Sequence, residues 1–138
     1  MTAYFKDKPV AGEDPVVYKL YSLPYSESPT DLMVVLTVLY GGRIGLEPFH
    51  TKGHFHHNPD GAEYVIGLSG RGTLELGSRD GTKESVPLTP GAHILVPPGL
   101  AHRALNMDHS PLLFVSLSSP AVGHDYQSVE SLGWVTPQ

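Results

Sequence analysis

The chain has 138 residues, of which 40% are hydrophobic and 17% charged, and its formal net charge at pH 7 is −5 with histidine neutral. This length and composition predict one folded domain with a buried core and exclude a disordered chain. The acidic balance argues against nucleic-acid binding and against an acidic-membrane surface, since both depend on clustered Lys and Arg, and the absence of cysteine excludes disulfides and thiolate metal sites.

Thirteen prolines and fifteen glycines punctuate the chain, and the apolar residues between them fall in short segments typical of β-strands. Residues 1–15 are expected to form a polar arm, without the apolar core that a signal peptide needs. Strands are predicted at 16–22 and 32–40, and the second, although it is the longest apolar run, is too short to cross a bilayer. We therefore expect a soluble, cytoplasmic protein.

The dipeptide Gly41-Gly42 is typical of a tight hairpin and leads into an irregular strand at 43–49, which Pro48 breaks. In the tail, residues 127–133 have the pattern of one or two helical turns, ended by a glycine. The other strands are expected at 62–68, 73–76, 83–88, 93–97, 102–106 and 112–118. Short strands separated by regularly spaced turns predict an all-β sandwich or small barrel that forms a single domain over residues 1–138.

The stretch HTKGHFHHNPDGAEY holds four histidines within eight positions. Because side chains alternate along a strand, His54 and His56 should point together, while Phe55 and His57 point the other way. Two imidazoles on one face suit a metal ion with Phe55 buried behind them. Glu63, seven residues after His56, would add a carboxylate oxygen, and this mixture of donors suits Fe, Mn, Ni or Zn.

A second stretch, GAHILVPPGLAHRALN, places His102 at the start of a strand with Asn106 on the same face. Its pattern, Gly-x5-Pro-x-Gly-x2-His-x3-Asn, matches the second cupin motif without a gap. Cupins are small β-barrels, jelly-roll-like double-stranded β-helices, in which three His and one Glu hold a metal inside the barrel. The resemblance implies this fold here, with a barrel over about 16–118 and a tail, 119–138, over the pocket mouth.

The first cupin motif, His-x-His followed by a Glu, resembles the arrangement of the two histidines and the glutamate in the first stretch. Two departures stand beside this resemblance, because the gap before Glu63 is longer than usual and Pro48 replaces the usual Gly. The implied ligands of one divalent transition metal (Fe, Mn, Ni or Zn) are His54, His56, Glu63 and His102.

Four fragments in order, namely TKGHFH, the longer spacing to Glu63, VPPGLAHR and GHDY, are similar to the cupin-type (archaeal-type) glucose-6-phosphate isomerase family. The similarity covers roughly Thr37 to Gly133. It implies a metal-dependent aldose–ketose isomerase acting on a sugar phosphate, with glucose 6-phosphate to fructose 6-phosphate as the expected reaction. Uncovered strand edges, which cupins commonly bury by exchanging strands, lead us to expect a homodimer.

The family resemblance also assigns roles to residues around the metal. The implied catalytic residues are Glu63, His124 and Tyr126, with the histidine and tyrosine reaching over the metal to the sugar. Hydroxyls and backbone N–H groups bind phosphate well, and glycine permits close approach. The implied phosphate-binding residues are Thr37, Thr51 and Gly53, to which we add Lys52.

Two positions differ from the family pattern, since Val65 and Ser118 stand where the family tends to have tyrosine. This difference keeps other functions open. The chain could be a non-catalytic carbohydrate-binding or sugar-phosphate-binding cupin, or a cupin dioxygenase that uses the same ligands around Fe. For the isomerase, proton transfer through an enediol and a hydride shift both remain possible.

Overall fold

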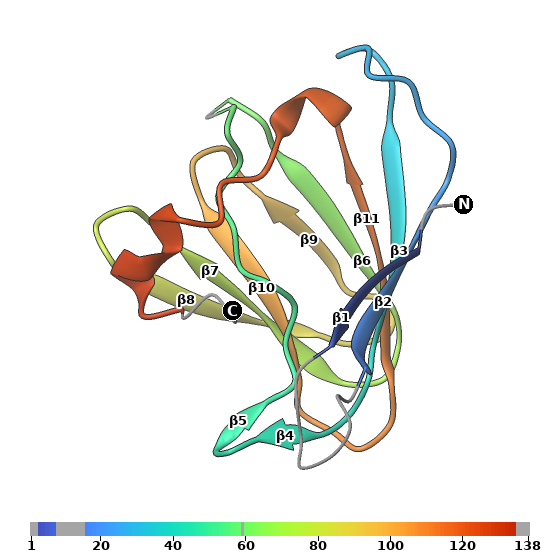
Figure 1. Cartoon of the computed structure of the whole chain (residues 1–138), viewed down its shortest axis with the longest axis vertical. Helices are drawn as coiled ribbons and strands as arrows, with labels where there is room; N and C mark the ends of the chain where they lie inside the picture. Colours follow the sequence, from blue (N-terminus) through green and yellow to red (C-terminus); the bar gives the residue numbers. More distant parts are fainter. Residues whose placement is uncertain (1–2, 8–15, 59, 135–138) are drawn as a thin grey trace.

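The computed structural model describes residues 3–7, 16–58 and 60–134. Strands dominate these ranges, and the two helices are short 3-10 turns. The strands form a six-stranded sheet in the order β1-β2-β3-β11-β6-β9, a three-stranded sheet β10-β7-β8 and a small pair β4-β5. Figure 1 shows the two larger sheets as the walls of an open barrel, which is the cupin double-stranded β-helix that the motifs predicted. The elements are β1 (Ala3–Asp7), β2 (Val16–Ser22), β3 (Met33–Leu39), β4 (Arg43–Ile44), β5 (Glu47–Pro48), β6 (Glu63–Ser69), β7 (Gly72–Gly77), β8 (Lys83–Leu88), β9 (His93–Val96), β10 (Ala101–Asn106), β11 (Leu112–Ser118), η1 (Pro120–Val122) and η2 (Ser128–Leu132).

The predicted strands from β2 onward are confirmed, and their boundaries agree to within one residue outside the β4-β5 region. The helical turns predicted at 127–133 are also present, as η2, and Gly133 with φ 70° follows its last residue. The arm predicted at 1–15 needs correction, because residues 3–7 form β1 and pair antiparallel with β2. The rest of that arm, residues 1–2 and 8–15, lies outside the described residues.

The hairpin predicted at Gly41-Gly42 is wrong. Both edges of β3 are already paired, one with β2 and the other with β11, so the chain after Leu39 has no free edge to fold back on. The turn occurs instead at Gly45, where φ is 62° and β4 pairs with β5. Gly41 has a different role, since a Cβ there would collide with the backbone carbonyl oxygen of His109.

The main apolar core fills the space between the two larger sheets, and alternation along each strand supplies it. In β6, for example, Val65 points inward and is 1% exposed, while its neighbour Tyr64 points outward. A second cluster joins the barrel to the tail and contains Phe55, Ala101, Val129, Leu132 and Trp134. Neither of the described helices has the length and apolar character that crossing a membrane requires.

The segment before the histidine cluster covers the free edge of β10, and this positions the site. Phe49 accepts a hydrogen bond from the Asn106 backbone N–H at 2.9 Å, and Thr51 donates one to the Ala104 carbonyl at 2.9 Å. Asn106 also connects β10 to the end of β3, since its Nδ2 donates a hydrogen bond to the Leu39 carbonyl at 3.0 Å. With both edges covered, every residue of β10 is buried.

Candidate metal centre

Backbone pairing brings the two histidine-bearing stretches together. The His54 N–H donates to the His102 carbonyl at 3.3 Å, and the His102 N–H donates back to the His54 carbonyl at 3.1 Å. Residues paired across an antiparallel bridge carry side chains on the same face, so both imidazoles point into the barrel. Their ring centroids are 4.4 Å apart.

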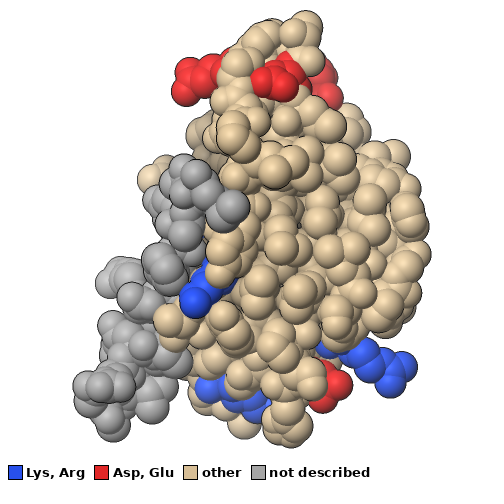
Figure 2. All heavy atoms as spheres, turned by 90° about the vertical axis from the view of Figure 1, so that its right-hand side faces the viewer, with Lys and Arg blue, Asp and Glu red and all other residues tan. Residues whose placement is uncertain are grey.

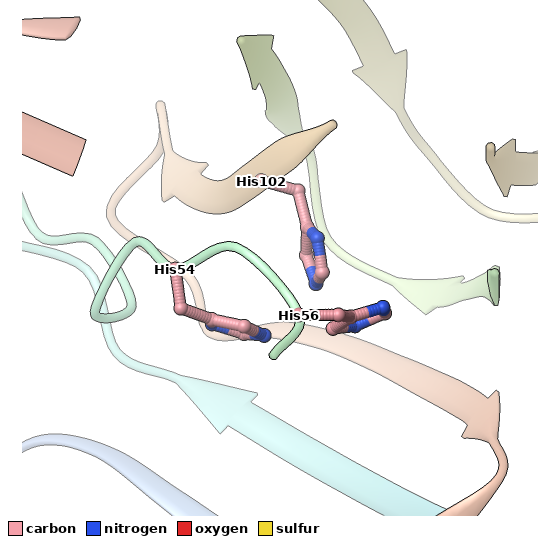
Figure 3. Close-up of side chains that lie close together, drawn as sticks. All are labelled: His54, His56 and His102. Atoms are coloured by element: carbon pink, nitrogen blue, oxygen red, sulfur yellow. The ribbon is translucent and has the colours of Figure 1, made fainter. Parts of the chain in front are cut away.

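His56 completes a group of three imidazoles (Figure 3). One ring nitrogen from each of His54, His56 and His102 lies within 4.8 Å of the others. Phe55, between the first two, is 1% exposed and lies in the second apolar cluster, as the strand alternation predicted. His57 is exposed.

Backbone carbonyls orient two of these rings. His54 Nδ1 is 3.3 Å from the Lys52 carbonyl oxygen and His56 Nδ1 is 3.0 Å from that of Gly61. A carbonyl can only accept, so each Nδ1 carries the proton and each Nε2 presents a lone pair. Both Nε2 atoms are buried and find no hydrogen-bond partner in the described part of the chain. Buried acceptors without partners are costly, and a metal ion would satisfy both, so the residues fit a metal.

Glu63, at the start of β6, brings a carboxylate against two of the imidazoles. Its Oε2 lies 2.5 Å from His102 Nε2 and its Oε1 lies 3.9 Å from His56 Nε2. The residue is 8% exposed. Three imidazole nitrogens and a carboxylate oxygen form a donor set that suits Fe, Mn, Ni or Zn and excludes a purely oxygen-ligated cation such as Ca²⁺.

The charges of the site agree with a ligand role. Burial lowers the pKa of His54 well below its usual value, and the neighbouring His102 and His124 lower it further, so this imidazole is neutral at pH 7. Burial alone would raise the pKa of Glu63, but the charge and hydrogen bond of His102 outweigh it and leave the pKa lowered. Both groups are therefore in the protonation states that bind a cation.

The tail places His124 and Tyr126 over the imidazoles. The Phe55 N–H donates to the Asp125 carbonyl at 2.9 Å and the Asp125 N–H donates back to the Phe55 carbonyl at 2.7 Å, which docks the tail on the segment that carries His54 and His56. His124 then lies 4.5 Å from the His54 ring between centroids, and Tyr126 lies 5.5 Å from it. The His124 and Tyr126 rings stack at an interplanar angle of 9°.

Two properties suit this pair of residues to contact a ligand. His124 keeps an exposed surface, yet desolvation beside the cluster still lowers its pKa, so it is neutral near pH 7. The Asp125 carboxylate accepts hydrogen bonds from Ser128 Oγ at 2.6 Å and from the Gln127 N–H at 3.1 Å. These bonds fix the bend that holds the two rings over the metal centre.

Three of the four residues predicted to bind phosphate follow one another on the segment beside β10. The Lys52 ammonium lies 4.1 Å from the centroid of the Tyr126 ring, at the same mouth as the stacked pair. Thr51 Oγ1 accepts a hydrogen bond from the Ala104 N–H at 2.9 Å, which gives this hydroxyl a structural role as well. Thr37 stands apart on β3, in the other sheet, where it is 3% exposed and shares the inward face with Leu39.

The inner wall beside Glu63 is made of small side chains. Ser118 pairs directly with Glu63 across β11 and β6, and Ser116 pairs with Val65, so these four residues share the inward face. The Ser118 residue is 5% exposed and Val65 is 1% exposed. The two positions at which the sequence departs from the family pattern are therefore both next to Glu63, Val65 along β6 and Ser118 across from it on β11.

The role of the tail cluster could not be read from the sequence. Trp134 packs on Gly53 so closely that a Cβ at Gly53 would lie 2.5 Å from the indole ring, and Leu132 packs on Gly77 in the same way. The Arg103 guanidinium lies 5.0 Å from the Trp134 ring centroid. The sequence shows Gly53, Gly77 and a single tryptophan, but nothing in it predicts that Trp134 packs on Gly53 or Leu132 on Gly77.

We expect Gly53→Ala to destabilise the fold by about 1–3 kcal/mol, because the added methyl group overpacks the Trp134 ring. Urea unfolding would measure this cost. The matched control is the same substitution in a Trp134→Leu background, where the smaller side chain leaves room and the cost should fall. An equal cost in both backgrounds would contradict the proposed contact.

Comparison with known proteins adds a family and a fold to this geometry. A family model described as glucose-6-phosphate isomerase matches residues 3–135. A protein of Thermococcus kodakarensis named glucose-6-phosphate isomerase is 40% identical in an alignment 138 residues long, gaps included. The alignment covers 97% of this chain and 73% of the relative.

Solved structures agree on the fold. A Klebsiella pneumoniae protein with a double-stranded β-helix domain aligns with a TM-score of 0.59 at 23% identity, covering 86% of this chain and 87% of the other. Oxalate decarboxylase of Bacillus subtilis, a protein with Mn(II) centres, aligns with a TM-score of 0.59 at 19% identity, covering 76% of this chain and 26% of the other.

Proposed function

The chain belongs to the glucose-6-phosphate isomerase family, and on this basis we propose that it is a metal-dependent isomerase that interconverts glucose 6-phosphate and fructose 6-phosphate. One observation supports the metal dependence, namely the convergence of three imidazoles beside the Glu63 carboxylate, two of them oriented by backbone carbonyls and left with unpartnered buried Nε2 atoms. The residues that would hold the metal are His54, His56, Glu63 and His102. Bound there, a divalent transition metal supplies Lewis-acid stabilisation of the negative charge that develops on the sugar oxygens, which is worth several kcal/mol.

We assign the proton transfer to Glu63. The lowered pKa keeps its carboxylate ionised across the neutral range, so it can accept the proton from C2 of the open-chain aldose. Return of that proton to C1, with transfer of the hydroxyl proton from O2 to O1, gives the ketose.

His124 and Tyr126 are proposed to open the sugar ring and position its hydroxyls. The neutral His124 imidazole can accept a hydroxyl proton, and the Tyr126 hydroxyl can donate a hydrogen bond to the ring oxygen. Lys52, at the same mouth, supplies a positive charge for the phosphate group. Thr37, Thr51 and Gly53 remain proposed phosphate contacts.

The test is a screen of sugar phosphates against protein stripped of metal and reloaded with Fe, Mn, Ni, Co or Zn in turn. We expect turnover of glucose 6-phosphate only in metal-loaded forms. With deuterium at C2, the label should wash out into water during turnover, because Glu63 exchanges its proton with solvent. Full retention of the deuterium at C1 would indicate a hydride shift and contradict proton transfer through Glu63. Activity of the metal-free protein would contradict the metal dependence.

A second candidate is a non-catalytic sugar-phosphate-binding protein, and the wall beside Glu63 favours it. Neither Val65 nor Ser118 offers a phenol to hold the substrate against the carboxylate. Binding of glucose 6-phosphate without turnover in any metal-loaded form would select this function. Turnover in the screen above would exclude it.

A further inference from the structure

Phe55 connects the metal centre to the tail, of which the structure describes residues 119–134. It stands between His54 and His56 in the chain, and its side chain lies in the second apolar cluster, where it is 1% exposed. Its backbone N–H and carbonyl exchange two hydrogen bonds with Asp125 of the tail. A change in the position of the tail therefore reaches both histidines through this one residue.

The second apolar cluster lies directly behind the histidines of the site. Ala101, which precedes His102 in the chain, belongs to it. Gly53, which precedes His54, packs against the Trp134 ring. The tail residues of the cluster, each 2% exposed or less, are Val129, Leu132 and Trp134. Each of the three histidines therefore has a neighbour in the chain that packs on the tail.

Two basic side chains of the smaller sheet add polar contacts to this packing. The Arg79 guanidinium lies 4.2 Å from the centroid of the Phe55 ring, and Lys83 Nζ donates a hydrogen bond to the Leu132 carbonyl at 3.1 Å. On the opposite side of the molecule, where β2 and β3 lie in Figure 1, Figure 2 shows a broad area without charged side chains. A cation over an aromatic ring is favourable, so these contacts hold Phe55 and the end of η2 together.

The segment that carries the first two histidines has little regular structure of its own. The described residues between β5 and β6 belong to no strand, and isolated bridges pair them with the rest of the chain. One of these bridges, Phe55 with Asp125, is made to the tail, and the Asn58 N–H donates to the Val122 carbonyl of the tail at 2.9 Å. Segments with few such contacts open locally at a low cost in free energy. The position of the two imidazoles thus depends on the tail as well as on β10.

We propose that Phe55 is a positioning residue that couples metal binding to docking of the tail. The coupling rests on the metal centre of the proposed function. With His54 and His56 held on a metal ion, the backbone on both sides of Phe55 is fixed, and its ring stays where the cluster requires it. Linkage makes the effect reciprocal, so the docked tail raises the metal affinity by the same factor, commonly about 5-fold to 150-fold.

The same coupling controls when the tail side chains stand over the site. His124 and Tyr126 belong to the tail, so both take their places over the imidazoles when the tail is docked. His124 is exposed and lies outside the group of three histidines whose nitrogens converge. The connection between metal and tail therefore runs through Phe55 and the cluster behind the site.

The first test follows opening of the tail in the wild type by limited digestion with chymotrypsin, with the products identified by mass spectrometry. We expect cleavage after Tyr126 to be about 5-fold to 150-fold slower with Co²⁺ bound than in protein stripped of metal. Cleavage after Tyr25 is the internal control, because that residue is 46% exposed and outside the tail, and its rate should not change. Equal rates of cleavage after Tyr126 with and without Co²⁺ would overturn the coupling.

The second test measures Co²⁺ affinity by equilibrium dialysis after the tail has been undocked. Val129→Asp places a carboxylate at a position that is 1% exposed, so the tail should leave the cluster and Co²⁺ should bind more weakly by the factor found in the first test. Gln127→Glu is the matched control, because it adds the same charge at an exposed tail position and should bind Co²⁺ as the wild type does. Circular dichroism would show that both variants are folded.

The outcomes distinguish Phe55 from His124 and the coupling from the metal centre. In His124→Ala, Co²⁺ should still slow cleavage after Tyr126, and loss of this protection would assign the coupling to His124 instead. Wild-type affinity in folded Val129→Asp whose tail is cleaved rapidly would overturn the coupling alone. A wild type that binds no Co²⁺ would contradict the metal centre and the coupling with it. Neither test contains a sugar, and the digestion of the wild type is decisive if Val129→Asp fails to fold.

Discussion

His102→Ala is expected to abolish metal binding and to lower kcat/KM by at least about 1,000-fold, since Lewis-acid stabilisation of several kcal/mol is lost and each 1.36 kcal/mol is a factor of ten. The substitution removes one of three converging nitrogens and leaves Glu63 without the imidazole 2.5 Å from its Oε2. Two imidazoles and a carboxylate that has lost its closest contact would not retain the ion through gel filtration.

The measurement combines metal analysis of protein made without a histidine tag with kinetics on glucose 6-phosphate. Wild type treated with a chelator should match the variant and recover on reloading, whereas the variant should not recover. His109→Ala is the control, because that histidine is exposed and outside the cluster. One metal ion per chain in folded His102→Ala would contradict the ligand assignment.

The parts of the site that depend on local patterns could be predicted from the sequence. Alternation along a strand fixes that His54 and His56 face together with Phe55 behind them, whatever the rest of the fold does. The turn before Glu63 returns the chain beside the same cluster. Most strands were likewise set by short apolar segments between glycines and prolines, and their boundaries agree to within one residue.

What the sequence could not predict depends on contacts between distant residues. The dipeptide Gly41-Gly42 has local hairpin chemistry, but β2 and β11 occupy both edges of β3, so tertiary pairing overrides it. The bridge from Phe55 to Asp125 and the packing of Trp134 on Gly53 join residues 70 or more positions apart along the chain. Such contacts leave no periodic signal, although they hold His124 and Tyr126 over the metal centre.

Glu63→Gln should lower kcat by about 100-fold to 10,000-fold, the range that general acid–base catalysis contributes, while KM changes little. Glutamine keeps the size of the side chain and one of its two oxygens, so the pocket keeps its shape. It has no carboxylate to take the proton from C2. Metal affinity should fall because one ligand loses its charge, so the assay needs metal in excess.

This variant could lose activity because it lacks the base or because it no longer binds the metal. Deuterium exchange at C2, measured together with metal content, separates these two causes. If Glu63 is the base, metal-saturated Glu63→Gln loses isomerisation and C2 exchange together, and metal analysis still finds the ion. Glu75→Gln is the control, because Glu75 pairs with Arg103 at 2.7 Å on β7 and β10, so its loss should reduce stability without changing kcat. Wild-type kcat in metal-loaded Glu63→Gln would mean that another residue moves the proton, or that hydride passes directly between C2 and C1.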